Sequence, residues 1–144
     1  MIKFDTSEID KFVIDLKGTS EDIRSDVQKV IKKAGFNIER NAKQNITNNG
    51  SVVTGHLRRG ITTNVGNMEV IVHTSNIKYA RGVEYGTKPH VIKAKSKKAL
   101  YWKGAKHPVK SVRHPGSRAK PYLIPAFEKE KEVLIRDLEK VIKW

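Results

Sequence analysis

Five histidines are the side chains that could serve catalysis or metal binding, but their spacing favours neither. His107 and His114 each precede a proline and lie seven positions apart, while His56, His73 and His90 are isolated. A zinc site needs several ligands at short, recurring spacings, and the chain has no cysteine. We therefore expect no metal and no cofactor, and we interpret the histidines as solvated or hydrogen-bonded loop residues.

Carboxylates that could hold a divalent cation are scarce in the middle of the chain. Between residues 40 and 127 the only acids are Glu69 and Glu84, so the carboxylate cluster of a metal-dependent nuclease is not expected. The glycines of residues 55–60 lack the Lys-Ser/Thr ending of a phosphate-binding loop. Because no nucleophile, base and orienting residue form a set, we predict that the protein is not an enzyme.

Glu84 has two local interpretations. It could pair with Arg81, three residues before it on a short predicted helix, or accept a hydrogen bond that fixes the turn before Gly86. Both interpretations are structural, and neither gives this carboxylate a role in catalysis.

Positive charge is concentrated in residues 85–127, which contain no Asp or Glu and supply +11 of the formal net charge of +14. Such a bias requires a negatively charged partner, either nucleic acid phosphate or an acidic protein surface. Tyr101, Trp102 and Tyr122 could stack on single-stranded nucleic acid, although Tyr101 and Trp102 equally suit a strand. Besides Lys88, the cations of this segment are the candidate contacts for a partner or DNA: Lys93, Lys95, Lys97, Lys98, Lys103, Lys106, Lys110, Arg113, Arg118 and Lys120.

The size and composition of the chain limit its class. At 144 residues it fits one domain, predicted over residues 1–144. The absence of cysteine suits a reducing compartment, and residues 1–12 alternate apolar and charged residues, unlike a secretory signal. No stretch approaches the length needed to cross a bilayer. We expect a soluble, intracellular protein with no membrane partner.

Apolar residues at helical spacing predict three helices, over about residues 7–17, 20–46 and 122–143. The second has Thr19 three residues before Asp22, an approximate capping box, and Gly35 is its weak point. The third begins near two prolines, which suit the first turn of a helix. Glu128, Glu130 and Glu132 lie toward its amino end and Lys140 and Lys143 toward its carboxyl end, which matches the helix dipole.

The middle of the chain, about residues 61–113, is rich in β-forming residues. Residues 61–65 and 68–73, joined by Gly66 and Asn67, predict an antiparallel hairpin. Residues 76–84 predict a short helix, and residues 90–94 and 99–102 are further strand candidates. Residues 93–120 are small, cationic and rich in glycine and proline, which predicts a long basic loop or arm. The predicted fold is α+β, with a long N-terminal helix and a C-terminal helix packed on a mainly antiparallel sheet.

Three clusters taken in order resemble a family of tailed-phage virion proteins. They are Val-Thr-Gly-His-Leu-Arg-Arg-Gly-Ile at 53–61, Tyr-Ala-Arg-Gly-Val-Glu-Tyr-Gly-Thr at 79–87, and His-Pro-Gly at 114–116 leading to Ala-Lys-Pro-Tyr-Leu-Ile-Pro-Ala at 119–126. The family comprises small neck or tail-completion components of long-tailed phages, often labelled minor tail or head–tail joining proteins. One departure is the basic Arg59, followed by Gly60, where the family more often has a non-basic residue.

The resemblance implies a structural role for the shared positions and no catalytic residue. Those of the first cluster shape the turn before the hairpin, those of the second shape the short helix, and those of the third begin the last helix. The positions are Thr54, Gly55, Leu57 and Arg58; Tyr79, Ala80, Glu84, Gly86 and Thr87; and Pro121, Leu123, Pro125 and Ala126.

The leading hypothesis is a virion protein that forms a ring, a hexamer by the resemblance, at the head–tail junction of a tailed phage or prophage. The expected partners are other copies of the chain, the head connector, and the tail tube or tail terminator protein. Genomic DNA would pass nearby with weak, non-specific contact, because a conduit should not grip the genome. The expected location is the virion, and the host cytoplasm during assembly. The alternative is a nucleic-acid-binding protein that uses residues 85–127.

Overall fold

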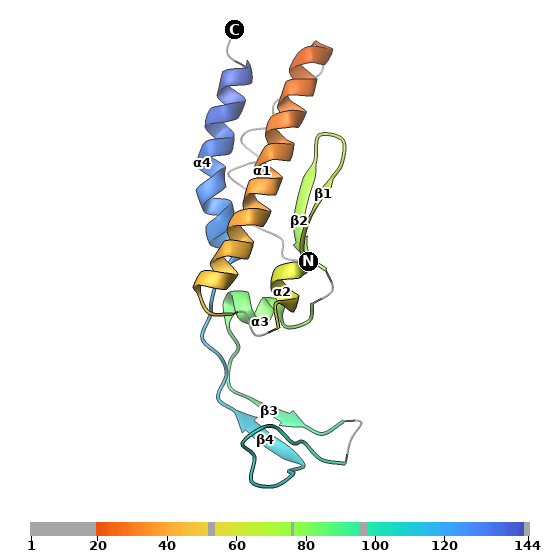
Figure 1. Ribbon diagram of the computed structural model, residues 1–144, viewed down its shortest axis with the longest axis vertical. Coiled ribbons are helices and arrows are strands. Elements are labelled where there is room, and N and C mark those ends of the chain that lie inside the picture. The colour runs from red at the N-terminus through yellow and green to blue at the C-terminus, as the bar shows by residue number, and fades with distance from the viewer. Residues whose placement is uncertain (1–19, 52–53, 76, 96–97, 143–144) are drawn as a thin grey trace.

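The computed structural model describes residues 20–51, 54–75, 77–95 and 98–142. Figure 1 shows an elongated molecule in which two long antiparallel helices lie side by side and a β-hairpin runs along one of them. A second hairpin projects beyond the end of this body. The helix predicted over about residues 7–17 lies outside the described residues. No helix in the described part of the chain is long and apolar enough to cross a membrane.

Helix α1 spans Glu21–Asn48, where the sequence predicts a helix over about residues 20–46. Its N-cap is Ser20, whose hydroxyl accepts a hydrogen bond from the backbone N–H of Ile23 at 3.5 Å. Acids in the first turn face the positive end of the helix dipole. The buried residues of α1 follow helical spacing and are Val27, Ala34, Gly35, Ile38, Ala42 and Ile46.

Helix α4, Leu123–Ile142, packs against α1 along its length. Polar contacts join the two helices at two levels. Asn37 donates a hydrogen bond to Oε1 of the buried Glu130 at 2.7 Å. Closer to the amino end of α1, the Lys33 ammonium lies 3.0 Å from the Asp137 carboxylate and lowers the pKa of that carboxyl.

Strands β1, Ile61–Val65, and β2, Val70–Thr74, form the predicted hairpin in the register Ile61↔Thr74 to Val65↔Val70. It lies against α1 at Gly35, where a Cβ would meet the Val70 side chain at 2.2 Å. The glycine that weakens the helix therefore lets the hairpin approach it closely.

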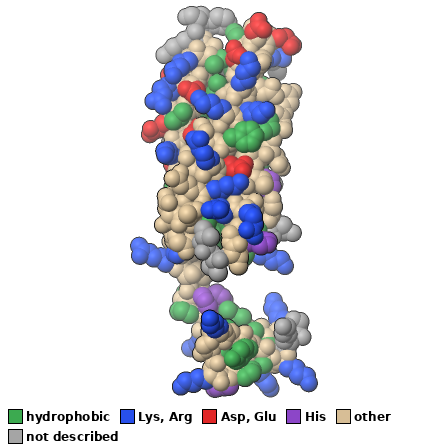
Figure 2. Space-filling model, viewed as in Figure 1, with side chains coloured by type: hydrophobic (Ala, Val, Ile, Leu, Met, Phe, Trp, Pro, Cys, Tyr) green, Lys and Arg blue, Asp and Glu red, His purple; other side chains and the backbone are tan. Residues whose placement is uncertain are grey.

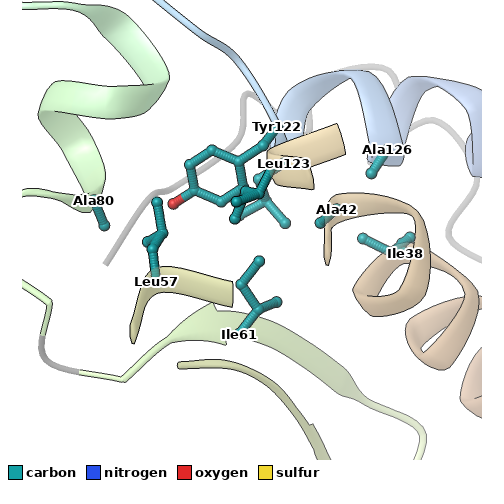
Figure 3. Packing of buried hydrophobic residues seen from close by; sticks show 9 residues of the cluster. Ile38, Ala42, Leu57, Ile61, Ala80, Tyr122, Leu123 and Ala126 are labelled. Carbon is teal, nitrogen blue, oxygen red and sulfur yellow. The ribbon is translucent and has the colours of Figure 1, made fainter. Parts of the chain in front are cut away.

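Two short helices, α2 at His56–Arg59 and α3 at Ala80–Tyr85, close the lower end of the body. Gly55, in the left-handed conformation at φ 71°, precedes α2, and the Thr54 hydroxyl accepts a hydrogen bond from the His56 N–H at 3.4 Å. One residue from each short helix, Leu57 and Ala80, joins the core where α1, α4 and β1 meet (Figure 3). The buried core cluster comprises Ile38, Ala42, Ile46, Leu57, Ile61, Ala80, Tyr122, Leu123 and Ala126.

The second hairpin pairs β3, His90–Lys93, with β4, Ser111–His114, in an antiparallel register from His90↔His114 to Lys93↔Ser111. The predicted strand at residues 99–102 contributes only an isolated bridge, Leu100↔Val109. The α+β fold class with long N-terminal and C-terminal helices is confirmed, but the β structure of the described residues consists of two separate hairpins rather than one sheet. The two are separate because α3 and the turn at Gly86 lead the chain away from the body before β3 begins.

Candidate interaction surface

The projecting hairpin begins at a buried carboxylate. Glu84, 2% exposed, directs its carboxylate at the first turn of α4. Oε2 accepts the backbone N–H of Tyr122 at 2.9 Å and of Leu123 at 3.0 Å, and Oε1 accepts that of Ile124 at 2.9 Å. The first N–H groups of a helix have no partner within the helix, so an acidic acceptor stabilises them. Glu84 is thus neither the partner of Arg81 nor a local turn residue, but a cap for a helix about forty residues away in sequence.

Backbone pairing continues this anchor into the hairpin. The Lys120 N–H donates to the Val83 carbonyl at 2.8 Å, and Thr87 and Ser117 exchange two backbone hydrogen bonds at 2.9 and 3.0 Å. Their hydroxyls lie 2.9 Å apart. At Gly116, φ is 89° and a Cβ would lie 2.2 Å from the Thr87 carbonyl oxygen. These contacts hold together the two segments of the chain that connect the hairpin to the body.

We call residues 87–118 the arm. Six of the nine large hydrophobic side chains that are exposed in the described structure lie in or beside it. Tyr101 is 69% exposed and Trp102 47%, and Val91 and Ile92 project from β3. Figure 2 shows hydrophobic side chains at the surface of the arm with Lys and Arg around them. Exposed apolar side chains in such a number are typical of an interaction surface.

The cations of the arm, together with the adjoining Lys120, are available for a partner. Every candidate contact that the structure describes is exposed: Lys93, Lys95, Lys98, Lys103, Lys106, Lys110, Arg113, Arg118 and Lys120. Lys97 lies outside the described residues. Within the described part of the chain none of these cations forms an ion pair, whereas lysines of the body pair with Asp26, Glu39 and Asp137.

Two histidines face each other at the base of the arm. The rings of His90 and His114, opposite each other in the β3–β4 register, have centroids 5.1 Å apart. The Gly116 N–H donates to Nδ1 of His114 at 3.0 Å, and Nδ1 of His90 lies 2.8 Å from the Lys88 carbonyl oxygen. Both rings are thereby oriented by backbone groups of the arm. Across the described residues, no three His, Asp or Glu side chains are grouped so as to hold a metal ion.

A groove of about 760 Å³ lies where the arm meets the body, and we call it the junction groove. Figure 2 shows the molecule narrowing at this level. Apolar side chains of Ile46, Leu57, Val83 and Ile92 line it, and none of its described lining residues is a carboxylate. Its basic and imidazole side chains are Arg58, Arg118, Lys120, His56, His90 and His114.

The residues singled out by the resemblance fall into three structural groups. Leu57, Ala80, Leu123 and Ala126 are buried in the core. Glu84, Gly86 and Thr87 form the base of the arm. The remaining positions lie on or near the surface at the lower end of the body, and they are Thr54, Gly55, Arg58, Tyr79, Pro121 and Pro125.

Three residues that contribute to this region were not singled out from the sequence. Asn45 donates to the Tyr122 carbonyl at 2.9 Å and Asn49 to the Lys120 carbonyl at 3.2 Å, so both fix the chain that leads into α4. Ser117 pairs with Thr87. A polar residue late on the predicted helix is a weak signal for Asn45, whereas nothing local distinguishes Asn49 or Ser117.

Comparison with known proteins identifies the family. Residues 10–86 match the protein family described as "Bacteriophage HK97-gp10, putative tail-component". No curated protein and no solved structure matches the chain. The match covers more than half of the sequence, from the N-terminal segment through α1, the β1–β2 hairpin and α3. It confirms the resemblance to a tailed-phage virion family, and the chain belongs to the HK97-gp10-like family of bacteriophage tail components.

Proposed function

We propose that this protein forms a ring at the head–tail junction of a tailed phage or prophage and joins the tail to the head. The observation that carries the proposal is the arm, which projects from the body with exposed cations and exposed apolar side chains. Family membership supports a structural role, so the protein acts by binding and not by catalysis. The resemblance implies six copies in the ring.

The chemistry of the arm favours a protein partner over DNA. Lysines alone would suit phosphates, but Val91 and Ile92 present aliphatic surface, which is typical of protein interfaces. An acidic surface on the head connector, or on the tail tube or terminator protein, would complement the charge of the arm and orient docking. Genomic DNA would pass nearby with weak contact. The protein would be assembled in the host cytoplasm and would then be part of the virion.

Inactivation of the gene in the encoding phage tests the function directly. We expect electron microscopy to show DNA-filled heads and complete tails that are not joined. Complementation with the triple variant Lys103→Glu, Lys106→Glu and Lys110→Glu should fail to restore joining. The matched control changes three exposed cations of the body instead, namely Lys32→Glu, Lys129→Glu and Arg136→Glu, and should restore it. Joined particles without the protein, or missing tails, would contradict a joining role.

The alternative of nucleic-acid binding has one observation in its favour. A hollow beside α3 brings the cations Lys78, Arg81 and Lys88 next to Tyr79 and Tyr85. If cations gripped phosphates, the logarithm of the affinity would fall with log salt at a slope of about 0.9 per phosphate neutralised. Filter binding to duplex DNA over a salt series measures this slope. Nanomolar binding at physiological salt would favour the alternative over the joining role.

A further inference from the structure

The junction groove has the chemistry of a site for an acidic, apolar segment. Ile46 and Leu57 are buried beneath it and Ile92 is exposed on its arm side. Arg58, Arg118 and Lys120 are all exposed around it, and no carboxylate is among the lining residues that the structure describes. An occupant should therefore carry carboxylates beside an apolar stripe, since unpaired cations at an interface need charged partners.

Residues 5–16 of this chain have that pattern. They contain four acids and one lysine, a net charge of −3, together with Ile9, Phe12, Val13 and Leu16. On a helix, at about 100° per residue, Asp5, Glu8 and Asp15 would fall within about 60° of Phe12. Lys11 would fall about 100° away and Lys3 and Lys17 farther still. Three of the four acids would thus lie on the Phe12 side of the apolar stripe, whereas Asp10 and Lys17 would lie beyond its other edge at Val13.

The reach of the chain shows which copy can supply this segment. Helix α1 begins at Glu21, and the groove is lined by Ile46 near the opposite end of the same helix. The 26 residues from Ser20 to Ile46 correspond to about 39 Å along the helix axis. Phe12 precedes Ser20 by eight residues, which span at most about 28 Å even when fully extended. Phe12 therefore cannot reach the groove of its own chain.

We propose that residues 5–16 of one subunit dock in the junction groove of a neighbouring copy. Such a contact joins two different surfaces of the same protein, and repeated around an axis it closes a ring. The inference rests on the proposed ring, because a monomer offers no neighbour to supply the segment. It also assigns Arg58, Arg118 and Lys120 to contacts between subunits rather than to the adjoining ring.

Disulfide trapping tests the contact, because the natural chain has no cysteine to interfere. A Phe12→Cys chain and an Ile92→Cys chain, one carrying a size tag, are mixed under mild oxidation. We expect a disulfide-linked heterodimer on a non-reducing gel, since a disulfide needs Cβ atoms about 4 Å apart. The control pairs Ile92→Cys with Phe36→Cys, which is 48% exposed on the body and should not react.

A charge exchange gives an independent measurement. Glu8→Lys with Asp15→Lys should weaken self-association by about tenfold or more, and so should Arg118→Glu with Lys120→Glu. Combining all four changes in one chain should restore association, as measured by light scattering across a concentration series. If either pair of substitutions weakened association only by unfolding the protein, adding the other pair would not restore it.

The outcomes separate this inference from the ring itself. Closed rings without the disulfide, and without rescue by charge exchange, would overturn the docking proposal while the ring stands. The disulfide with only open oligomers in electron micrographs would support docking and count against the ring. If neither rings nor the disulfide form, docking is wrong too. If Arg118→Glu abolishes binding to DNA or to an adjoining virion protein while self-association persists, that partner occupies the groove instead.

Discussion

The carboxylate of Glu84 accepts the backbone N–H of Leu123 at 3.0 Å, across 39 positions in the sequence. This contact joins the last turn of α3 to the first turn of α4. Because the chain leaves the body for the arm after Glu84 and re-enters the body at Leu123, the same contact fixes the base from which the arm projects. The stability of the body and the placement of the arm are therefore linked through one side chain.

Glu84→Gln should lower the free energy of unfolding by about 1–3 kcal/mol, because the amide group replaces an acceptor oxygen and leaves a buried N–H without a partner. The loss should appear as a lower midpoint in urea denaturation followed by circular dichroism. Glu132→Gln, on the exposed side of α4, is the control and should change the midpoint little. Equal stability of the two variants would show that the Glu84 cap contributes nothing.

Gly116→Ala should open the base of the arm while the rest of the body stays folded. The new Cβ would lie 2.2 Å from the Thr87 carbonyl oxygen, so the Thr87–Ser117 pairing must separate. We expect faster hydrogen exchange at the Thr87 and Ser117 amides, measured by NMR. Gly104→Ala is the matched control, since φ there is also positive, at 98°, but no atom lies within 4 Å of the added Cβ. Equal protection in both variants would contradict a close approach at Gly116.

The spacing of residues in the sequence was sufficient to predict the helices and the first hairpin, because their stabilising contacts repeat at regular intervals along the chain. The stripe from Val27 to Ile46 and the charge order of α4 indicate helices, and Gly66 with Asn67 indicates the first hairpin. The contact between Glu84 and the start of α4 could not be predicted in the same way. Glu84 has its partners 38–40 residues away, so its nearest cation in sequence, Arg81, was a misleading signal.

The strand pairing of the arm also could not be predicted from local sequence. Strand β4, Ser111–His114, has little β-forming sequence of its own and is specified by pairing with β3 across the intervening loop. The junction groove depends on three segments that are distant in sequence, represented by Ile46, Leu57 and His114. The clusters at 53–61, 79–87 and 114–126 are far apart in sequence, and only the fold brings them to one end of the body.

Gly35→Ala should destabilise the protein although alanine favours a helix by about 1 kcal/mol over glycine. The added Cβ would meet Val70 Cγ1 at 2.2 Å and Thr63 Cγ2 at 3.1 Å, so the β1–β2 hairpin must shift. Thermal unfolding should show a lower midpoint for Gly35→Ala than for the natural protein. The same substitution should lower the midpoint less when it is made in a chain that already carries Val70→Ala. Ser25→Ala, on the exposed face of α1, is the control for helix propensity and should not lower the midpoint. A midpoint raised by Gly35→Ala would contradict close packing of the hairpin on α1.

Stability should fall in alkaline solution partly because of Tyr122. Burial, and then the negative charge of Glu84, raise the pKa of Tyr122 to about 12, above the ordinary value near 10 of an unfolded chain. A group with a raised folded pKa contributes its full stability below the unfolded pKa. That contribution is lost as the pH rises from about 10 to about 12, because the unfolded chain releases the phenol proton first.

Urea denaturation of the natural protein and of Tyr122→Phe at a series of pH values between 9 and 12 isolates this contribution. Every other ionisable group is present in both proteins, so the difference between the two curves reports the Tyr122 hydroxyl. We expect the natural protein to lose more stability over this range than Tyr122→Phe. Tyr101→Phe should follow the natural protein, because the Tyr101 side chain is exposed on the arm and is not buried by folding. Parallel curves for the natural protein and Tyr122→Phe would mean that the phenol of Tyr122 ionises as readily in the folded protein as in the unfolded chain.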